Sequence, residues 1–151
     1  MTVKPIPDDY AGATPYLCVK DAFRAIDFYK KAFGARETMR MTQPDGRVGH
    51  AEIRIGRAPI MLADEFPEID FRSPQTLGGT PVNILVYVEN VDALAAQAQA
   101  AGATIKRPVA DQFYGDRVVV LADPFGHSWS FATHIEDVAP DEMNKRAAAH
   151  K

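Results

Sequence analysis

The stretch from Gly49 to Arg54 carries the clearest candidates for chemistry in the sequence. His50, Glu52 and Arg54 alternate with other residues as in a β-strand with one buried side, so their side chains are expected to share one face. An imidazole beside a carboxylate could act as a general acid and base, or could supply two ligands to a metal ion. The alternative is a solvated or salt-bridged strand face, which is ordinary in a sheet with one buried side.

A second group of candidates lies just before an expected strand that begins at Arg117. Tyr114 could carry a proton, and the planar guanidinium of Arg117 could bind a carboxylate or a phosphate through two hydrogen bonds. Gly115 allows a sharp bend in the backbone between them. In the alternative interpretation, Asp116 and Arg117 form ion pairs with another subunit or with the C-terminal segment.

Composition and charge exclude several classes of protein. The chain has 151 residues, of which 46% are hydrophobic and 25% charged, as in an ordinary globular domain. A net charge of -3 without clustered basic residues argues against binding to nucleic acid or to an anionic membrane surface. No apolar stretch approaches the length of a membrane span. Small organic molecules or another copy of the chain are therefore the expected partners.

Cysteine usage is minimal. Cys18 is the single cysteine, so the chain can form neither an internal disulfide nor a Cys-rich zinc site. We therefore expect a cytoplasmic protein, and a buried, unreactive thiol is the favoured interpretation of Cys18.

The elements that position these residues occur twice, with a period of about 69 residues. The first copy begins with an expected strand over 14–20, followed by Asp21, a typical helix N-cap residue. A helical stripe comes next, and Gly34 stands where a C-terminal cap is expected. The stripe consists of Phe23, Ile26, Tyr29 and Phe33. The second copy repeats this order with a strand over 83–89, an N-cap at Asn90 and an Ala-rich helix that ends at Gly102.

Each copy continues with strands and tight turns. The turn 43–46 precedes strands at 50–55 and 59–64, and the turn 123–126 separates strands at 117–122 and 128–133. Both turns have Pro at the second position and Gly at the fourth, which is typical of type I turns. Residues 66–80, which include prolines and glycines, are expected to form a linker or a flap, and residues 138–149 a tail helix. The sequence therefore predicts an α+β fold.

Four ordered motifs make the sequence resemble the vicinal-oxygen-chelate superfamily of glyoxalases, bleomycin-resistance proteins and dioxygenases, and within it the PhnB-like branch. The motifs are AIDFYKKAFGA at 25–35, GDR at 115–117, DPFGHSW at 123–129 and ATHIED at 132–137. The resemblance implies a single domain over 1–151 with two βαβββ modules, at about 12–65 and 81–134. Their curved mixed sheet would enclose a ligand cavity with the helices outside. Homodimerisation is also implied.

Metal-dependent members of such a family place four ligands, usually His and Glu, on the first and last strands of the two modules. The matching positions in this sequence are Thr14, Met61, Asn83 and Ser130. Hydroxyl, thioether and amide groups are poor ligands for zinc or iron, which favour imidazole, thiolate and carboxylate donors. We therefore predict no metal at these positions and no other cofactor. With Tyr16 and Tyr87 on the same strand faces, the four positions are predicted to line a ligand cavity instead.

Three functions follow from these residues. The first is a metal-free protein that binds a small organic molecule, as the bleomycin-binding relatives do, and it is favoured because all four metal ligands are replaced. The second is a metal-independent lyase or isomerase that uses His50 and Glu52, or Tyr114, as proton carriers and Arg117 to hold an anion. The third is a metal-dependent glyoxalase- or dioxygenase-like enzyme, which needs the ligands that the four positions do not provide.

Overall fold

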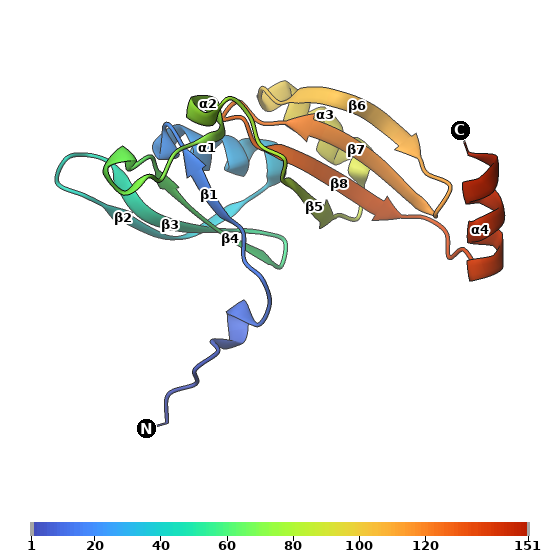
Figure 1. Cartoon of the computed structure of the whole chain (residues 1–151), viewed down its shortest axis with the longest axis horizontal. Helices are drawn as coiled ribbons and strands as arrows, with labels where there is room; N and C mark the ends of the chain where they lie inside the picture. The colour runs from blue at the N-terminus through green and yellow to red at the C-terminus, as the bar shows by residue number, and fades with distance from the viewer. Residues whose placement is uncertain (1, 151) are drawn as a thin grey trace. The chain divides into compact units, whose positions relative to one another are not determined.

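Each copy of the repeat folds into a four-stranded sheet with one helix packed against it. The computed structural model describes residues 2–150, and its helices and strands are labelled in Figure 1. The chain divides into two compact units between Gly79 and Thr80, which we describe separately as module one and module two. The α+β class predicted from the sequence is confirmed.

Module one contains a mixed sheet in the order β1-β4-β3-β2. β1 runs parallel to β4, and the other neighbours are antiparallel. The elements are a 3-10 helix Asp8–Tyr10, β1 Tyr16–Val19, α1 Ala22–Phe33, β2 Arg36–Thr42, β3 Val48–Ile55, β4 Ala58–Asp64, a 3-10 helix Pro67–Ile69 and α2 Pro74–Leu77. The last two lie in the segment 66–80, so this expected linker has helical structure of its own.

Module two repeats the arrangement with a sheet in the order β5-β8-β7-β6. β5 runs parallel to β8, and the other neighbours are antiparallel. The elements are β5 Asn83–Tyr87, α3 Val91–Ala101, β6 Thr104–Asp111, β7 Asp116–Ala122, β8 Ser128–His134 and α4 Pro140–Ala149. The tail helix expected over 138–149 thus begins at Pro140, a favourable first residue for a helix.

α1 begins and ends at the predicted cap residues. The Asp21 side chain accepts a hydrogen bond from the backbone N–H of Arg24 at 3.2 Å, and Gly34 adopts a left-handed φ of 66°. α3 has the same caps, because Asn90 accepts a hydrogen bond from the N–H of Ala93 at 3.0 Å and Gly102 is left-handed. Local signals in the sequence therefore fix both helices.

The apolar stripe of α1 differs from the prediction at one position. Ile26, Tyr29 and Phe33 are buried against the sheet, but the ring of Phe23 is 46% exposed. Ala22, one residue earlier, occupies the position that faces the sheet in the first turn. Phe23 instead lies under the guanidinium of Arg40 at 4.7 Å. The prediction that Phe23 is part of the core stripe is wrong for this reason.

A second cap at each helix start comes from the last strand of the same module. In module one, buried Asp64 at the end of β4 accepts hydrogen bonds from the N–H groups of Ala22 at 2.8 Å and Val48 at 2.7 Å. In module two, the hydroxyl of Thr133 accepts from the N–H of Val91 at 2.9 Å. These contacts attach the start of each helix to the last strand of its own module. Each helix therefore packs on one face of its sheet, and the other face is not covered by that helix.

The turn 123–126 organises the core of module two. The buried carboxylate of Asp123 accepts hydrogen bonds from the N–H groups of Phe125 and His127, at 2.8 and 3.0 Å, and from the indole N–H of Trp129 at 2.9 Å. Trp129 is fully buried and stacks on Phe131, with ring centroids 6.0 Å apart. One carboxylate therefore shapes the turn and satisfies the indole.

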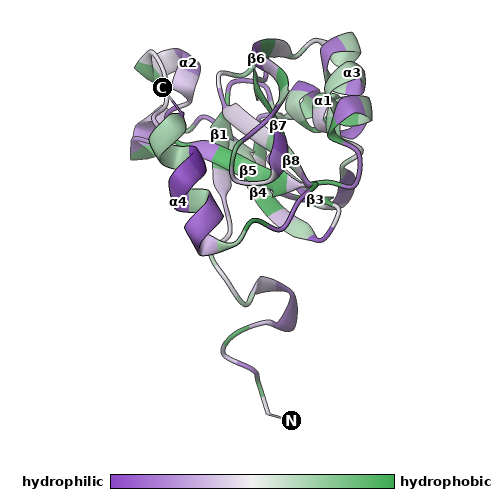
Figure 2. Cartoon of the chain, turned by 90° about the vertical axis from the view of Figure 1, so that its right-hand side faces the viewer, coloured by the Kyte–Doolittle hydropathy of each residue, from purple (hydrophilic) through white to green (hydrophobic). Residues whose placement is uncertain are grey.

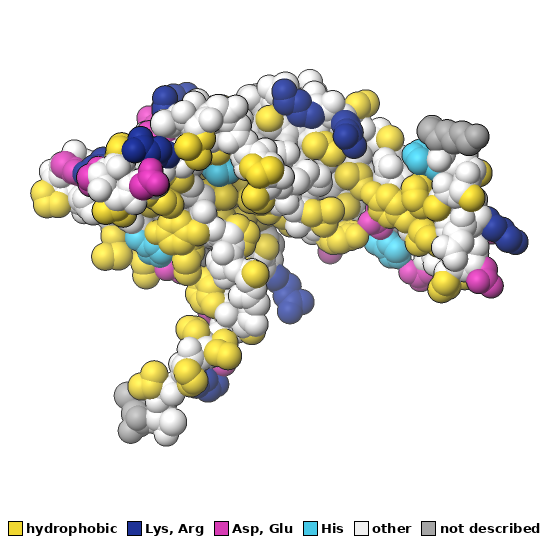
Figure 3. Space-filling view, viewed as in Figure 1, with side chains coloured by type: hydrophobic (Ala, Val, Ile, Leu, Met, Phe, Trp, Pro, Cys, Tyr) yellow, Lys and Arg dark blue, Asp and Glu magenta, His cyan; other side chains and the backbone are white. Residues whose placement is uncertain are grey.

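The tail helix α4 is attached to its own module. Arg146 donates hydrogen bonds to the carbonyl oxygen of Phe113 at 3.1 Å and to the carboxylate of Glu136 at 2.7 and 3.0 Å. Hydrophilic residues dominate much of α4, and charged side chains of both signs lie along it (Figures 2 and 3). Within the described residues, every helix is too short or too polar to cross a lipid bilayer.

Candidate functional site

Four side chains of module one form a continuous chain of hydrogen bonds. The hydroxyl of Tyr10 donates to the Oε1 atom of Glu52. The Oε2 atom of Glu52 lies 2.9 Å from Nε2 of His50, and Nδ1 of His50 lies 2.6 Å from the hydroxyl of Tyr16. The structure thus brings His50, Glu52 and Tyr16 together, as three of the residues singled out from the sequence.

Strand register explains how these residues meet. Met61 on β4 lies between Tyr16 on β1 and Glu52 on β3, because it is the Cα partner of both. Residues that pair directly across strands point to the same side of a sheet, so the three side chains share one face. The other face of β3 carries Ala51 and Ile53, which are fully buried on the α1 side. The structure therefore places His50 and Glu52 on one face of β3, as the alternation in the sequence predicted.

Two members of this chain, Glu52 and Tyr16, have shifted pKa values. Hydrogen bonds from Tyr10 and then from His50 lower the pKa of Glu52, so this carboxylate is ionised at neutral pH. Burial, and then the charge of Glu52, raise the pKa of Tyr16 above the ordinary value for a phenol. An anionic Glu52 can accept a hydrogen bond from Nε2–H of His50; in the neutral imidazole with that tautomer, Nδ1 accepts a hydrogen bond from the Tyr16 hydroxyl.

An open, mostly apolar pocket of about 320 Å³ adjoins this chain. Its lining residues are Tyr16, Gly49, Ala63, Phe66, Ile69 and Phe71. The rings of Tyr16 and Phe71 meet edge to face with centroids 5.9 Å apart, and the ring of Tyr16 also contacts His50 at 5.4 Å. Among the described residues that line the pocket, Tyr16 alone has a polar side-chain group. An apolar pocket with one oriented polar group is typical of small-molecule sites.

The segment after β4 builds one wall of the pocket. Phe66 and Phe71 form an isolated antiparallel bridge around the short helix Pro67–Ile69, and Asp70 completes the turn in the left-handed region. Glu65, which precedes the segment, holds its C-terminal end in place, because the Glu65 carboxylate accepts a hydrogen bond from the N–H of Ser73 at 2.7 Å. The segment expected to be a linker or flap is therefore an ordered part of the site.

Sequence reasoning missed several residues of the site, and the largest of these are Tyr10, Phe66, Ile69 and Phe71. Two aromatic rings within a Pro-rich stretch were an available signal, because a solvent-exposed linker seldom carries such residues. Arg47 also lies over the ring of Phe66, 4.0 Å from its centroid, from a turn 19 positions earlier. Such a distant contact leaves no local pattern in the sequence.

The four positions matched to metal ligands lie in different settings. Thr14 precedes β1, and Met61 lies in the row described above. In module two the amide of Asn83 donates a hydrogen bond to the hydroxyl of Ser130 at 2.9 Å. Within the described part of the chain, no three His, Cys, Asp or Glu side chains form a group that could hold a metal ion. The donor set at the four positions does not fit a divalent cation.

Module two has a hydrogen-bonded cluster of its own. The hydroxyl of Tyr87 donates to the buried carboxylate of Asp116 at 2.6 Å, and Nδ1 of His134 lies 2.7 Å from the other oxygen of Asp116. Nε2 of His134 lies 2.7 Å from Asp137. Tyr87, predicted to line a cavity, is thus engaged by Asp116.

Gly115 holds this cluster close to the segment that follows β8. Its carbonyl oxygen accepts hydrogen bonds from Ile135 and Glu136, and its φ is 100°. A Cβ atom at this position would lie 2.1 Å from the carbonyl oxygen of Glu136, so only glycine fits. The close approach explains the glycine of the GDR motif.

We predict that His134 makes the stability of the protein depend on pH. Hydrogen bonds to Asp116 and then to Asp137 raise the pKa of His134 above its ordinary value near 6.5. The stabilisation is therefore complete below about pH 6.5 and is lost as the pH rises through the raised pKa of the folded state. In urea denaturation, the difference in midpoint between wild type and His134→Ala should be largest near pH 6 and should shrink by about pH 9. A difference that does not change with pH would contradict this account.

Arg117 and Tyr114, which were expected to hold an anion and to carry a proton, lie outside the hydrogen-bond chain of module one. Arg117 pairs with Asp111 at 2.6 Å and with Asp92 at 3.0 Å, both in module two. Neither carboxylate belongs to the C-terminal segment, so the expected pairing of Arg117 with that segment is wrong. Tyr114 contacts Phe113 edge to face, with ring centroids 5.4 Å apart.

Cys18 lies in the core of module one. The residue is buried on β1, and burial, followed by the charges of Glu65 and Asp64, raises the pKa of its thiol to about 12. Such a thiol is protonated at neutral pH and is a poor nucleophile.

Comparison with known proteins agrees with the duplicated architecture. Two sheets of the same order, each with a helix between its first two strands, define a protein of two βαβββ modules. Residues 9–131 match the model of the Glyoxalase/Bleomycin resistance protein/Dioxygenase superfamily. The chain belongs to this superfamily, as its motifs predicted.

Individual relatives support the same assignment. The uncharacterized protein Mb0911c of Mycobacterium bovis is 46% identical over 133 residues, which cover 86% of this chain and 88% of that protein. Among solved structures, TioX from Micromonospora sp. ML1 is 29% identical with a TM-score of 0.65, over 82% of this chain and all of TioX. The fosfomycin resistance protein FosX from Mesorhizobium loti, 15% identical with a TM-score of 0.61 over 82% of this chain and 91% of FosX, shares the fold.

Proposed function

We propose that the protein binds a compact apolar small molecule that carries a hydrogen-bond donor, in the pocket of module one. The observation that carries the proposal is the pocket of about 320 Å³ between Tyr16 and the Phe66–Phe71 segment. Its aromatic and aliphatic walls favour an apolar ligand, because burial of apolar surface is the main source of affinity in such sites.

The hydrogen bonds around Tyr16 favour a donor on the ligand. When the Tyr16 hydroxyl donates its hydrogen bond to Nδ1 of a neutral His50, the Tyr16 oxygen keeps lone pairs that can accept a hydrogen bond from a ligand. Glu52 fixes the imidazole in this tautomer through Nε2. A ligand N–H or O–H group that reaches Tyr16 can therefore donate a hydrogen bond to its hydroxyl oxygen and extend the hydrogen-bond chain.

A metal-dependent glyoxalase or dioxygenase reaction finds no support in the donor set described above, and it ranks third. We expect protein purified without chelator to contain less than one-tenth equivalent, roughly, of zinc, nickel or iron by elemental analysis, because hydroxyl, thioether and amide donors bind these ions weakly. A stoichiometric amount of one of these metals in the purified protein would contradict this expectation.

A metal-independent acid/base enzyme is the second candidate, and the Tyr16–His50–Glu52 chain favours it. The chain has the form of a proton relay, in which Glu52 orients the imidazole. However, the lowered pKa of Glu52 makes it a poor general acid, and the raised pKa of Tyr16 keeps its hydroxyl protonated, so that no phenolate is present to act as a base. His50 alone would then carry the proton, which is why binding ranks first. Recovery of bound ligand unchanged, by mass spectrometry, supports binding; a chemically altered ligand supports the enzyme.

The substitution Tyr16→Phe separates the donor requirement from simple burial. Indole and benzofuran have the same shape, but only indole has an N–H donor. We expect wild-type protein to bind indole about 3- to 10-fold more tightly than benzofuran in a calorimetric titration, the range that one net hydrogen bond supplies. The variant should bind both with the same affinity. Equal affinities in wild type, or a preference that survives in Tyr16→Phe, would refute the role of Tyr16.

We also propose a homodimer of the PhnB-like branch in the cytoplasm, in keeping with the resemblance and the single cysteine. Light scattering of the purified chain tests the dimer, since a mass near 16.6 kDa would show a monomer.

A further inference from the structure

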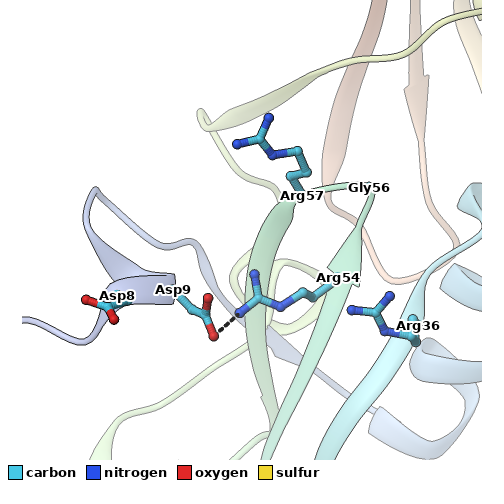
Figure 4. Close-up of a pocket in the computed structure, with 6 residues that line it drawn as sticks. All are labelled: Asp8, Asp9, Arg36, Arg54, Gly56 and Arg57. Carbon is cyan, nitrogen blue, oxygen red and sulfur yellow. Dashed lines mark ion pairs between the residues drawn. The ribbon is translucent and has the colours of Figure 1, made fainter.

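Three arginines of module one surround a second depression, of about 550 Å³, which shares no lining residue with the apolar pocket. Its lining residues are Asp8, Asp9, Arg36, Arg54, Gly56 and Arg57. Figure 4 shows the guanidinium group of Arg54 directed toward Asp9 and that of Arg36 beside the Arg54 side chain, while Arg57 extends away from both, from the turn between β3 and β4. The depression thus presents positive charge from three separate backbone positions.

Strand register forces two of these charges together. Arg36 on β2 and Arg54 on β3 are direct Cα partners, so their side chains leave the same face of the sheet. Like charges placed directly opposite each other destabilise a sheet. Arg57 stands in the two-residue turn between Ile55 and Ala58, which are partners in the same hairpin. The local fold therefore gathers positive charge that an anion would neutralise.

The acidic residues of the depression compensate this charge only in part. Asp9 lies 3.7 Å from Arg54, beyond a normal hydrogen bond, and its side chain is 78% exposed. Asp8 pairs with Lys4 at 3.0 Å. Within residues 2–150, neither Arg36 nor Arg57 forms an ion pair of its own. Two guanidinium groups are therefore available to a ligand, and the third has a weakly held partner.

Arg54 is held in place by the functional chain described above. Its guanidinium lies 5.5 Å from the centroid of the Tyr10 ring, and its side chain is only 17% exposed. Tyr10 in turn donates to Glu52. Arg54 is therefore pre-positioned, so that less side-chain entropy is lost when it binds an anion.

We propose that Arg36, Arg54 and Arg57 form a binding site for a doubly charged oxyanion of the phosphate class, and that the carboxylate of Asp9 competes for it. Guanidinium groups bind phosphate oxygens through paired, charge-assisted hydrogen bonds. Three donors that approach from different directions suit a tetrahedral anion better than a planar carboxylate. The site shares no lining residue with the apolar pocket, so either proposal can fail without the other.

Titration of the full-length chain with inorganic phosphate, followed by two-dimensional NMR at low salt, tests the site. Saturable shifts at Arg36, Arg54 and Gly56 are expected. Arg36→Ala and Arg57→Ala should each weaken binding by about tenfold, because each removes a charge-assisted contact. Asp9→Asn should strengthen binding by about three- to tenfold, since the competing charge is lost. Malonate should bind at least about tenfold more weakly than phosphate.

Two controls separate the site from general charge effects and from the pocket. Arg24→Ala removes the same charge from an exposed position on α1, which packs on the other face of the sheet, and it should leave phosphate affinity unchanged. Phe71→Ala alters the apolar pocket and should also leave it unchanged. Absent saturation, an equal loss in Arg24→Ala, an unchanged affinity in Asp9→Asn, or malonate binding as tight as phosphate would overturn the proposal.

Discussion

Replacement of Asp123 by alanine is expected to lower the free energy of unfolding by about 3–5 kcal/mol, because three donors lose their acceptor at once. The indole N–H of Trp129 is the most costly of these, since the residue is fully buried. The N–H groups of Phe125 and His127 lose the contacts that shape the turn. Urea denaturation monitored by tryptophan fluorescence measures the change, since Trp129 is the single tryptophan.

Asp27→Ala is the matched control for this result. Asp27 forms an exposed pair with Lys31 on α1 at 2.9 Å, and its loss should change the free energy of unfolding by less than about 0.5 kcal/mol. Asp123→Asn should fall between the two, because the amide keeps an acceptor for the backbone. A loss below about 1 kcal/mol in Asp123→Ala would contradict the role of Asp123 in the core.

Phe71→Ala is expected to reduce the affinity for indole by about 10-fold or more. The substitution removes the ring that faces Tyr16 across the pocket, and an aromatic side chain of this size contributes about 1.5–3 kcal/mol when it is buried. The backbone bridge between Phe66 and Phe71 does not depend on the ring, so the fold should be retained. Calorimetric titration measures the affinity, and thermal unfolding verifies the fold.

Phe23→Ala provides the comparison for Phe71→Ala. Phe23 is a partly exposed ring that contacts Arg40 and lies outside the pocket. Its loss should leave indole affinity within about twofold of wild type. Equal losses in the two variants would show that indole binds apolar surface in general and would contradict a specific site in module one.

The parts of the fold that the sequence predicted depend on local signals. Asp21 and Asn90 cap their helices through contacts three residues away, and the turn 123–126 closes through its own glycine. The alternation of residues around His50 and Glu52 is also a local signal, because alternate residues of a strand point to opposite faces of the sheet. Such features can be predicted from the sequence because the residues that interact are close together in it.

The parts that the sequence did not predict depend on distant contacts. Tyr10 joins the site through Glu52, 42 residues away, and Arg117 is bound by Asp92, 25 residues away. The ring of Phe66 in the pocket wall is covered by Arg47, 19 residues earlier in the chain. Partner choice at such distances follows from the packed fold, so spacing alone could not place these residues or identify the partners of Arg117.

Titration of the full-length chain with indole, followed residue by residue by two-dimensional NMR, tests the central claim most directly. If module one binds a small apolar molecule beside Tyr16, the amide signals of Gly49, Ala63 and Phe71 should shift in a saturable manner, and the same signals should respond less to benzofuran. Linear shifts without saturation, or shifts confined to residues outside this pocket, would contradict the claim.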